Sequence, residues 1–259
     1  MVKVYGLDIG KMTDPKEEEA LLEKLSAKRQ RRVLACSQLK GRREMTGAGL
    51  LLSAVLEKQG FSEEELVYGS NGKPLVPTKD NSKEFHFNLS HSGEMVLMAV
   101  SSKEVGCDVE QWENEKQGAT LMEQLDRVSQ EAVPGEEEHT LEAVPIEENA
   151  LSRRHQKIAQ RFFTEKEQKA VDEGGKKAFY RIWTRKESYI KMTGEGMKVP
   201  FLSLDTCPVS LDSKKIAQQG ELQPCFFQEY DLPGYQIAIC AQEKEFPEEI
   251  SFLDLEELF

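Results

Sequence analysis

Two carboxylates that stand two positions apart are the first candidates for chemistry in this chain. Asp108 and Glu110 follow Val105-Gly-Cys107, a segment typical of a β-strand. Because alternate residues of a strand point to the same side, we expect both carboxylates on one face. Adjacent carboxylates repel each other unless a proton or a cation lies between them, and Mg²⁺ prefers such oxygen ligands. The spacing alone is also common on solvated strand faces.

A second candidate group lies in the second half of the chain, in a segment with helical character. Trp183, Glu187 and Lys191 follow one another at intervals of four residues, so one helical face would carry all three. One interpretation is a surface ion pair between Glu187 and Lys191, worth about 0.3–0.5 kcal/mol. The other makes Glu187 a third metal ligand and Lys191 a phosphate ligand. Trp183 is expected to pack in the core.

A third group of polar side chains, Ser90-His91-Ser92, follows the apolar alternation of Phe87-Asn-Leu89. Adjacent strand residues point apart, so Ser90 and His91 do not form a nucleophilic dyad. Their hydroxyl and imidazole groups are suited to phosphate, although they are equally compatible with structural hydrogen bonds. The chain has no nucleophile elbow, no P-loop and no dinucleotide-binding fingerprint.

The elements that must position these residues indicate an α+β chain. Helices are expected near 14–25, 27–40, 43–58 and 178–192, with another that opens at the capping-box pattern of 164–167; strands are expected near 2–5, 85–89, 95–100, 105–109, 201–204, 222–230 and 235–240. We expect the strands within 85–109 to form an antiparallel meander, because their connections are too short for helical crossovers. Each half then combines helices with a small antiparallel sheet, which predicts two similar lobes with a cleft between them.

Composition indicates a globular protein in a reducing compartment. Hydrophobic residues make up 39% of the 259 residues and charged residues 31%, and no apolar run approaches the roughly 20 residues that span a bilayer. No signal peptide is visible at the N-terminus. The five cysteines form no CxxC motif and have no metal-ligand spacing to the histidines. We therefore expect a cytoplasmic protein with no membrane segment and no structural zinc.

The net charge of −12 is distributed unevenly along the chain. Residues 113–150 hold eleven acidic and two basic residues, whereas residues 24–43 hold eight basic residues and no acid. The basic cluster suggests an anionic partner or, equally well, a solvated helix face. Nucleic acid is not expected, because no aromatic residues interleave with the basic ones.

The segment 113–156 looks like an insertion. The sequence Glu131-Ala-Val-Pro recurs at Glu142-Ala-Val-Pro with a period of 11 residues, and two copies are too few for a solenoid. Its charge and prolines predict a mobile surface loop between an N-terminal lobe, 1–112, and a C-terminal lobe, 157–259. The spacing of Leu121, Met122, Leu125 and Val128 is also typical of one short amphipathic helix within it.

Together these segments resemble the 4′-phosphopantetheinyl transferases of the Sfp type. The motifs that carry the resemblance are, in order, Gly72-Lys-Pro74, Phe87-Asn-Leu-Ser-His-Ser92, Gly106-Cys-Asp-Val-Glu110, Arg161-Phe-Phe163 with Glu167, and Trp183-x-x-Lys-Glu-x-x-x-Lys191. The similarity covers about residues 1–112 and 156–240. It implies an α+β fold of two lobes related by a pseudo-twofold axis, with the active site in the cleft.

The resemblance implies a holo-[acyl-carrier-protein] synthase activity. Such enzymes transfer 4′-phosphopantetheine from coenzyme A to a serine of an apo acyl, peptidyl or aryl carrier protein and release adenosine 3′,5′-bisphosphate. Asp108, Glu110 and Glu187 would hold Mg²⁺, with Asp108, Glu187 and Lys191 as the catalytic residues. Glu187 would take the serine proton, with Glu167 or a metal-bound water as alternatives, and Lys191 would stabilise the leaving phosphate.

The same resemblance implies a set of residues for coenzyme A. They are Arg29 and Arg32 at the nucleotide, Arg43 at the 3′-phosphate, Gly72, Lys73 and Pro74 along the adenine, and Ser90, His91, Lys186 and Lys191 at the phosphates. A monomer is expected, because one chain supplies both halves of the site. The alternatives are a metal-dependent nucleotide hydrolase and a non-catalytic coenzyme A sensor. The acidic insertion is either a passive loop, which we favour, or a device that repels acidic carriers.

Overall fold

The computed structural model describes residues 1–12, 15–77, 84–112, 151–196, 199, 201–207 and 225–255 of the chain. The elements are, in order, β1 (Lys3–Asp8), α1 (Pro15–Glu23), α2 (Ala27–Ala35), α3 (Leu39–Lys58), η1 (Glu63–Glu65), β2 (Val67–Tyr68), β3 (Pro74–Leu75), β4 (His86–Ser92), β5 (Met95–Ser101), β6 (Val105–Gln111), α5 (Arg153–Phe162), α6 (Glu165–Thr193), η3 (Phe201–Ser203), β7 (Phe226–Leu232), β8 (Tyr235–Ala241) and β9 (Ser251–Leu253). The mixture of helices and small sheets confirms the predicted α+β class.

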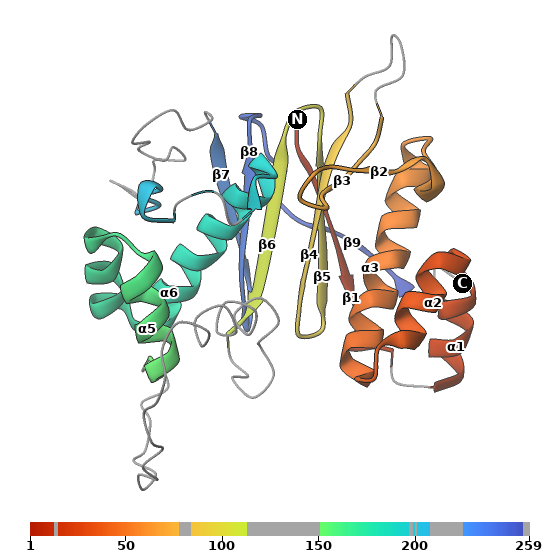
Figure 1. Cartoon of the computed structure of the whole chain (residues 1–259), viewed down its shortest axis with the longest axis horizontal. Coiled ribbons are helices and arrows are strands. Elements are labelled where there is room, and N and C mark those ends of the chain that lie inside the picture. The colour runs from red at the N-terminus through yellow and green to blue at the C-terminus, as the bar shows by residue number, and fades with distance from the viewer. Residues whose placement is uncertain are drawn as a thin grey trace, which may run out of the picture.

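Two sheets lie next to each other in the middle of the molecule, with helices on both outer sides (Figure 1). The strand order is β4-β5-β1-β9 in the first sheet and β6-β8-β7 in the second. One buried cluster, with Leu51 and Val96, joins α1–α3 to the first sheet, and another, with Trp183, joins α5 and α6 to the second. A third, with Leu97 and Val109, lies between the sheets. The burial of Trp183 confirms its predicted place in the core.

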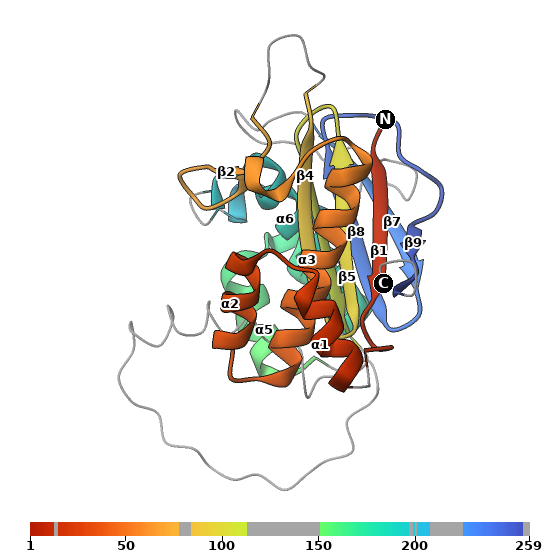
Figure 2. The ribbon, with the colours of Figure 1, turned by 90° about the vertical axis from the view of Figure 1, so that its right-hand side faces the viewer.

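The predicted meander is correct for β4 and β5 and wrong for β6. β5 pairs with β4 on one side and with β1 on the other, so neither of its edges is available to β6. β6 pairs instead with β8 and opens the second sheet. Conversely β9, which the sequence did not predict, returns the chain to the first sheet as a parallel neighbour of β1 (Figure 2). Both sheets therefore contain strands from both ends of the chain.

Alternation in β6 follows the prediction. Cys107 and Val109 point into the apolar cluster between the sheets. The intervening residues, Asp108 and Glu110, consequently lie on the face toward α6, where contacts between the two elements are dense. The strand thus carries its two carboxylates out of the apolar layer and toward a helix.

The boundaries of several elements differ from those expected. The helix predicted over 27–40 ends at Ala35, where Cys36 is extended, and α3 begins at Leu39. The Arg42 side chain donates to the Cys36 carbonyl at this break. The segment 201–204 begins with a 3₁₀ helix rather than a strand. The predicted capping box at Thr164 is present, and Gly194 ends α6 in the left-handed conformation.

Some predictions fall on residues that the structure does not describe. The repeat and the short helix predicted within the 113–150 segment lie outside the described residues, as do residue 14 of the first predicted helix and residues 222–224 of a predicted strand. In the described part of the chain, no helix is long and apolar enough to cross a membrane.

Candidate active site

An ion pair between Asp108 and Lys191 forms the centre of the site. The Lys191 Nζ atom lies 2.6 Å from Asp108 Oδ1 and 3.1 Å from the Ser90 hydroxyl. β4 supplies Ser90, β6 supplies Asp108 and the last turns of α6 supply Lys191. Burial lowers the pKa of Lys191, but Asp108 and Glu187 outweigh that effect and raise it overall, so the ammonium stays charged.

Gly106 allows β6 and α6 to approach closely enough for this ion pair. A β-carbon built at Gly106 would lie 2.0 Å from the Ser188 carbonyl oxygen and 2.4 Å from the Met192 backbone nitrogen. Any larger residue would therefore collide with the helix backbone. The glycine in Gly106-Cys-Asp-Val-Glu110 sets the distance between the strand carboxylates and the residues of α6.

Glu110 and Glu187 complete a group of three carboxylates. Burial, followed by the charge of Asp108, raises the pKa of Glu110 to about 8. Burial raises the pKa of Glu187 to about 8 as well, with Asp108 adding to it and Lys191 opposing it. Burial also raises the pKa of Asp108. These shifts show that burial, with neighbouring carboxylates adding to it, disfavours full ionisation of the three acids, and that the single ammonium of Lys191 does not offset this effect.

Two buried oxygens of this group have no hydrogen-bond partner among the described residues, Asp108 Oδ2 and Glu187 Oε1. No three His, Cys, Asp or Glu side chains within those residues are arranged as a metal site. The donor set nonetheless suits a divalent cation: when a cation displaces their protons, the three carboxylates face one ammonium and leave two negative charges for the cation to balance. Unpartnered carboxylate oxygens are the ligands that hard cations take.

A pocket of about 300 Å³ connects this centre to the predicted adenine-side motif. Gly72, Lys73 and Pro74 line it together with Glu187 and Lys191. Gly72 has φ +78°, a conformation that glycine adopts readily, in the turn between β2 and β3, and Asn71 and Lys73 of this hairpin contact the end of α6. The sequence motifs at 72–74 and 183–191 are thus brought to one pocket.

The hairpin is fastened to α6 by polar contacts that the sequence did not predict. Lys73 Nζ lies 2.6 Å from Glu104 Oε2 and donates to the Met192 carbonyl at 2.8 Å. Asn71 donates to the Gly194 carbonyl at 2.9 Å. The ammonium of Lys73 therefore faces the protein as well as the pocket.

His91 lies in a basic environment next to this centre. Burial and the charges of Lys191 and Lys40 lower its pKa to about 4, so the imidazole is neutral at pH 7. Its Nδ1 atom is 3.6 Å from a carboxylate oxygen of Glu44. A neutral imidazole beside two ammonium groups is compatible with an anionic ligand, and sequence reasoning missed Lys40, although it belongs to the basic 24–43 cluster.

Lys186 does not join the phosphate-binding set that the resemblance implied. Its side chain is fully buried, and the ammonium contacts Glu167 at 2.8 Å and the carbonyls of Phe201 and Leu204 at 2.8 and 2.5 Å. These three acceptors use all three ammonium protons. The expectation that Lys186 contacts phosphate is therefore wrong: the residue holds η3 against α6.

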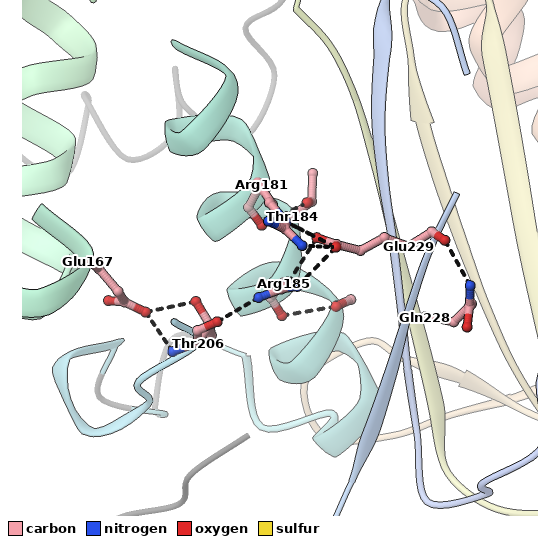
Figure 3. A network of polar contacts seen from close by, with 8 residues as sticks. Glu167, Arg181, Thr184, Arg185, Thr206, Gln228 and Glu229 are labelled. Atoms are coloured by element: carbon pink, nitrogen blue, oxygen red, sulfur yellow. Dashed lines mark hydrogen bonds and ion pairs between the residues drawn. The ribbon is translucent and has the colours of Figure 1, made fainter. Parts of the chain in front are cut away.

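Glu167 is likewise a structural residue. It is fully buried, and its Oε1 atom accepts hydrogen bonds of 2.7 Å from both the backbone and the hydroxyl of Thr206 (Figure 3). In the same network Arg181 and Arg185 share the carboxylate of Glu229 on β7. The network fixes α6 against its surroundings, and it removes Glu167 as an alternative proton acceptor.

Ser90 lies at the centre of the site, and its hydroxyl makes three hydrogen bonds within the protein. The oxygen accepts from Lys191 and from the Val109 backbone, and the hydroxyl proton goes to Asp108 at 3.0 Å. Because the two donors leave Asp108 as the acceptor, no hydroxyl proton remains for a phosphate. In this arrangement the hydroxyl donates to Asp108, and its contact with phosphate stays a prediction.

The three arginines predicted for the nucleotide lie on α2 and α3, the helices that pack against the first sheet. Arg43 pairs with Glu18 and lines a separate cavity of about 220 Å³ with Lys40 and Gly93. Arg29 pairs with Glu63 in η1, and Arg32 is exposed on α2. Neither Arg29 nor Arg32 lines the pocket next to Lys191.

Comparisons with known proteins agree with these motifs. The sequence profile of the 4′-phosphopantetheinyl transferase superfamily matches residues 141–240. The 4′-phosphopantetheinyl transferase ffp of Bacillus subtilis is 28% identical, over 99% of this chain and 100% of its own length. The 4′-phosphopantetheinyl transferase Sfp of Bacillus subtilis (strain 168) is 26% identical over the same shares. The 4′-phosphopantetheinyl transferase psf-1 of Bacillus pumilus is 29% identical over 84% of this chain and 78% of its own.

These relatives match the chain almost from end to end, and the motif residues that the sequence spreads over three segments meet at Asp108 and Lys191. The chain therefore resembles the 4′-phosphopantetheinyl transferase superfamily, and the relatives that it matches over nearly its full length include Sfp.

Proposed function

We propose that this enzyme transfers 4′-phosphopantetheine from coenzyme A to a serine of an apo acyl or peptidyl carrier protein. The observation that carries the proposal is the partly buried contact of Lys191 with Asp108, beside two unpartnered carboxylate oxygens and a pocket. Such a site can bind a diphosphate through an ammonium group and a cation. Full-length similarity to enzymes named 4′-phosphopantetheinyl transferases supports the same reaction.

We propose that Asp108, Glu110 and Glu187 hold Mg²⁺. The support is their mutual electrostatic influence, their burial and the unpartnered oxygens of Asp108 and Glu187. When bound, the ion would neutralise charge on the pyrophosphate of coenzyme A.

The residues of the chain then have separate tasks in the transfer. The carrier serine oxygen attacks the β-phosphorus of coenzyme A, and the bond from that phosphorus to the oxygen of the departing adenosine 3′,5′-bisphosphate breaks. Glu187 accepts the serine proton; burial raises the pKa of this carboxyl in the metal-free site, which favours proton uptake, whereas a bound cation would lower it. Lys191 stabilises the charge that develops on the phosphates. His91, Lys73 and Arg43 position the nucleotide end, with Gly72 and Pro74 along the adenine.

The proposal extends to the arrangement of the chain. We propose two lobes related by a pseudo-twofold axis, built on segments 1–112 and 157–259, with the site in the cleft between them. In this arrangement β6 belongs to the first segment but pairs in the second sheet, whereas β9 belongs to the second segment but pairs in the first sheet. Of the predicted insertion 113–156, residues 113–150 lie outside the described residues, and α5 begins within its last part, at Arg153. We propose a cytoplasmic location, which agrees with the five free cysteines. We also propose a monomer, because one chain supplies every residue of the site.

The proposal is tested by the release of adenosine 3′,5′-bisphosphate from coenzyme A with and without an apo carrier protein. A transferase releases it only with the carrier, one molecule for each serine modified. A metal-dependent hydrolase would release it without a carrier, and a sensor would bind coenzyme A without releasing it. Either of these two results would refute the proposed transfer.

Binding of Mg²⁺ is expected to depend on pH. Glu110 and Glu187 each have a pKa of about 8, above the ordinary value of 4.5, so below pH 8 both carry protons that the cation must displace. The affinity for Mg²⁺ should therefore rise as the pH increases from 6 to 8 and level off above that. Calorimetric titrations in buffers of different ionisation enthalpy measure both the affinity and the protons released; an affinity independent of pH would exclude these two ligands.

A further inference from the structure

The two sheets meet at a seam that contains no backbone ladder. β4 and β6 are edge strands of different sheets, and the backbone N–H groups of Cys107, Val109 and Gln111 point from β6 toward β4. The side chains of Asn88, Ser90 and Ser92 accept these three N–H groups at 3.0, 3.3 and 3.0 Å. We call this set of three contacts the β4–β6 seam. It satisfies an edge that would otherwise be left unpaired.

Two of the three contacts continue into the carboxylates of the site. Ser90 accepts from the Val109 N–H and donates to Asp108 at 3.0 Å; Ser92 accepts from the Gln111 N–H and donates to Glu110 at 3.3 Å. Each serine thus links the backbone of one β6 residue to the carboxylate of the residue before it. The period of two on β4 matches the period of two of the carboxylates on β6.

The Asn88 contact differs from the other two because it has no carboxylate to hold. The side-chain oxygen Oδ1 of Asn88 accepts a hydrogen bond from the Cys107 N–H. The residue before Cys107 is Gly106, which has no side chain. The seam therefore contains its own comparison: one contact, from a residue that also lines the pocket, joins the strands without orienting an acid, and two contacts orient an acid as well.

We propose that Ser90 and Ser92 are positioning residues that hold the carboxylates of Asp108 and Glu110 in the orientation needed to bind a divalent cation. This inference rests on the proposed function. A hydroxyl is the small group that can accept from an N–H and donate to a carboxylate at the same time. Both serines are buried, with 6% and 8% of their surface exposed, so water does not readily replace either contact. The role differs from the phosphate contact that the resemblance implied for Ser90.

Ser92 gives the cleaner test, because Ser90 also touches Lys191. Replacing Ser92 with alanine or valine removes the donor to Glu110, whereas Ser92→Thr keeps it. Threonine and valine have nearly the same shape, so this pair separates the hydroxyl from packing. Loss of a partner that orients a metal ligand typically weakens metal binding by about 10- to 100-fold. We expect Ser92→Ala and Ser92→Val to weaken cation binding by at least about tenfold, and Ser92→Thr to stay within about threefold of the wild type.

The experiment uses Mn²⁺ as the probe, with the electron paramagnetic resonance signal of the free ion reporting binding to the whole protein. Thermal melting is measured on every variant, and coenzyme A binding is measured in EDTA. Asn88→Ala is the matched control, since it removes a seam contact without touching a carboxylate. It should lower the melting temperature as Ser92→Ala does and leave Mn²⁺ affinity within about twofold. Coenzyme A binding in EDTA should not change in the Ser92 variants.

The inference is overturned if Ser92→Val binds Mn²⁺ as tightly as Ser92→Thr, or if Asn88→Ala weakens binding as much as the serine variants do. If Ser92→Ala does not fold, the comparison of threonine with valine still decides. Failure of the proposed function looks different: the wild type itself would then not bind Mn²⁺ or would not modify a carrier. A normal wild type with unaffected Ser92 variants refutes only the positioning role.

Discussion

Replacing Glu187 with glutamine is expected to lower kcat/KM for carrier modification by about 10²–10⁴-fold, the range typical of a lost proton acceptor. Glutamine keeps the shape of the side chain but can neither take the serine proton nor supply a charged oxygen to a cation. Because burial raises the pKa of Glu187 to about 8, its ionised form is disfavoured in the fold. The melting temperature of the variant should therefore be no lower than that of the wild type.

The control for this substitution is Glu173→Gln on the same helix. Glu173 is exposed, with 71% of its side-chain surface accessible, and lies in the first part of α6, before the kink at Gly175. Its replacement should leave both rate and stability unchanged. A Glu187→Gln enzyme that keeps more than about a tenth of the wild-type kcat/KM would remove Glu187 from the proton transfer.

Replacing Gly106 with alanine is expected to damage both stability and activity. The new methyl group would lie 2.0 Å from the Ser188 carbonyl oxygen and 2.4 Å from the Met192 nitrogen. Both atoms are backbone, so α6 must move away from β6, at a cost of about 1–3 kcal/mol in the free energy of unfolding. The movement also carries Glu187 and Lys191 away from Asp108. A displacement of about 1 Å at reacting groups can lower the rate by about 10²-fold.

Gly69→Ala provides the comparison for Gly106→Ala. A β-carbon at Gly69 would meet its neighbours at 3.6 Å or more, which is ordinary van der Waals contact, and Gly69 has no positive φ. Urea unfolding and steady-state kinetics of the two variants separate the close approach from a general effect of removing a glycine. Wild-type stability and rate in Gly106→Ala would show that the approach of β6 to α6 is not required.

The parts of the site that the sequence predicted depend on local periodicity. Alternation in β6 correctly places Asp108 and Glu110 on one face, and helical spacing correctly places Glu187 near Lys191. The resemblance assigned both Lys186 and its neighbour Glu187 to the active site. Adjacent residues of a helix, however, point about 100° apart. Lys186 therefore faces η3 and Glu167 instead of the pocket. Periodicity fixes which residues share a face, and the structure shows what each face meets.

The remaining differences arise from long-range pairing. Nothing local to β6 shows that β5 is already flanked by β4 and β1, or that β8, more than a hundred residues later, is its partner. The short β9 pairs with β1 from the other end of the chain for the same reason. The β4–β6 seam did leave a signal, since polar residues occupy every second position from Asn88 to Ser92. That alternation indicates a strand whose inner face meets polar groups.

Intact-protein mass spectrometry of an apo carrier protein, incubated with coenzyme A, Mg²⁺ and this enzyme, tests the central claim most directly. We predict that the carrier gains the mass of one phosphopantetheine group, and that the gain disappears with EDTA or with Glu187→Gln. If no acyl, peptidyl or aryl carrier gains that mass while the enzyme still binds coenzyme A, the chain is not a transferase, and the catalytic roles of Asp108, Glu187 and Lys191 are refuted.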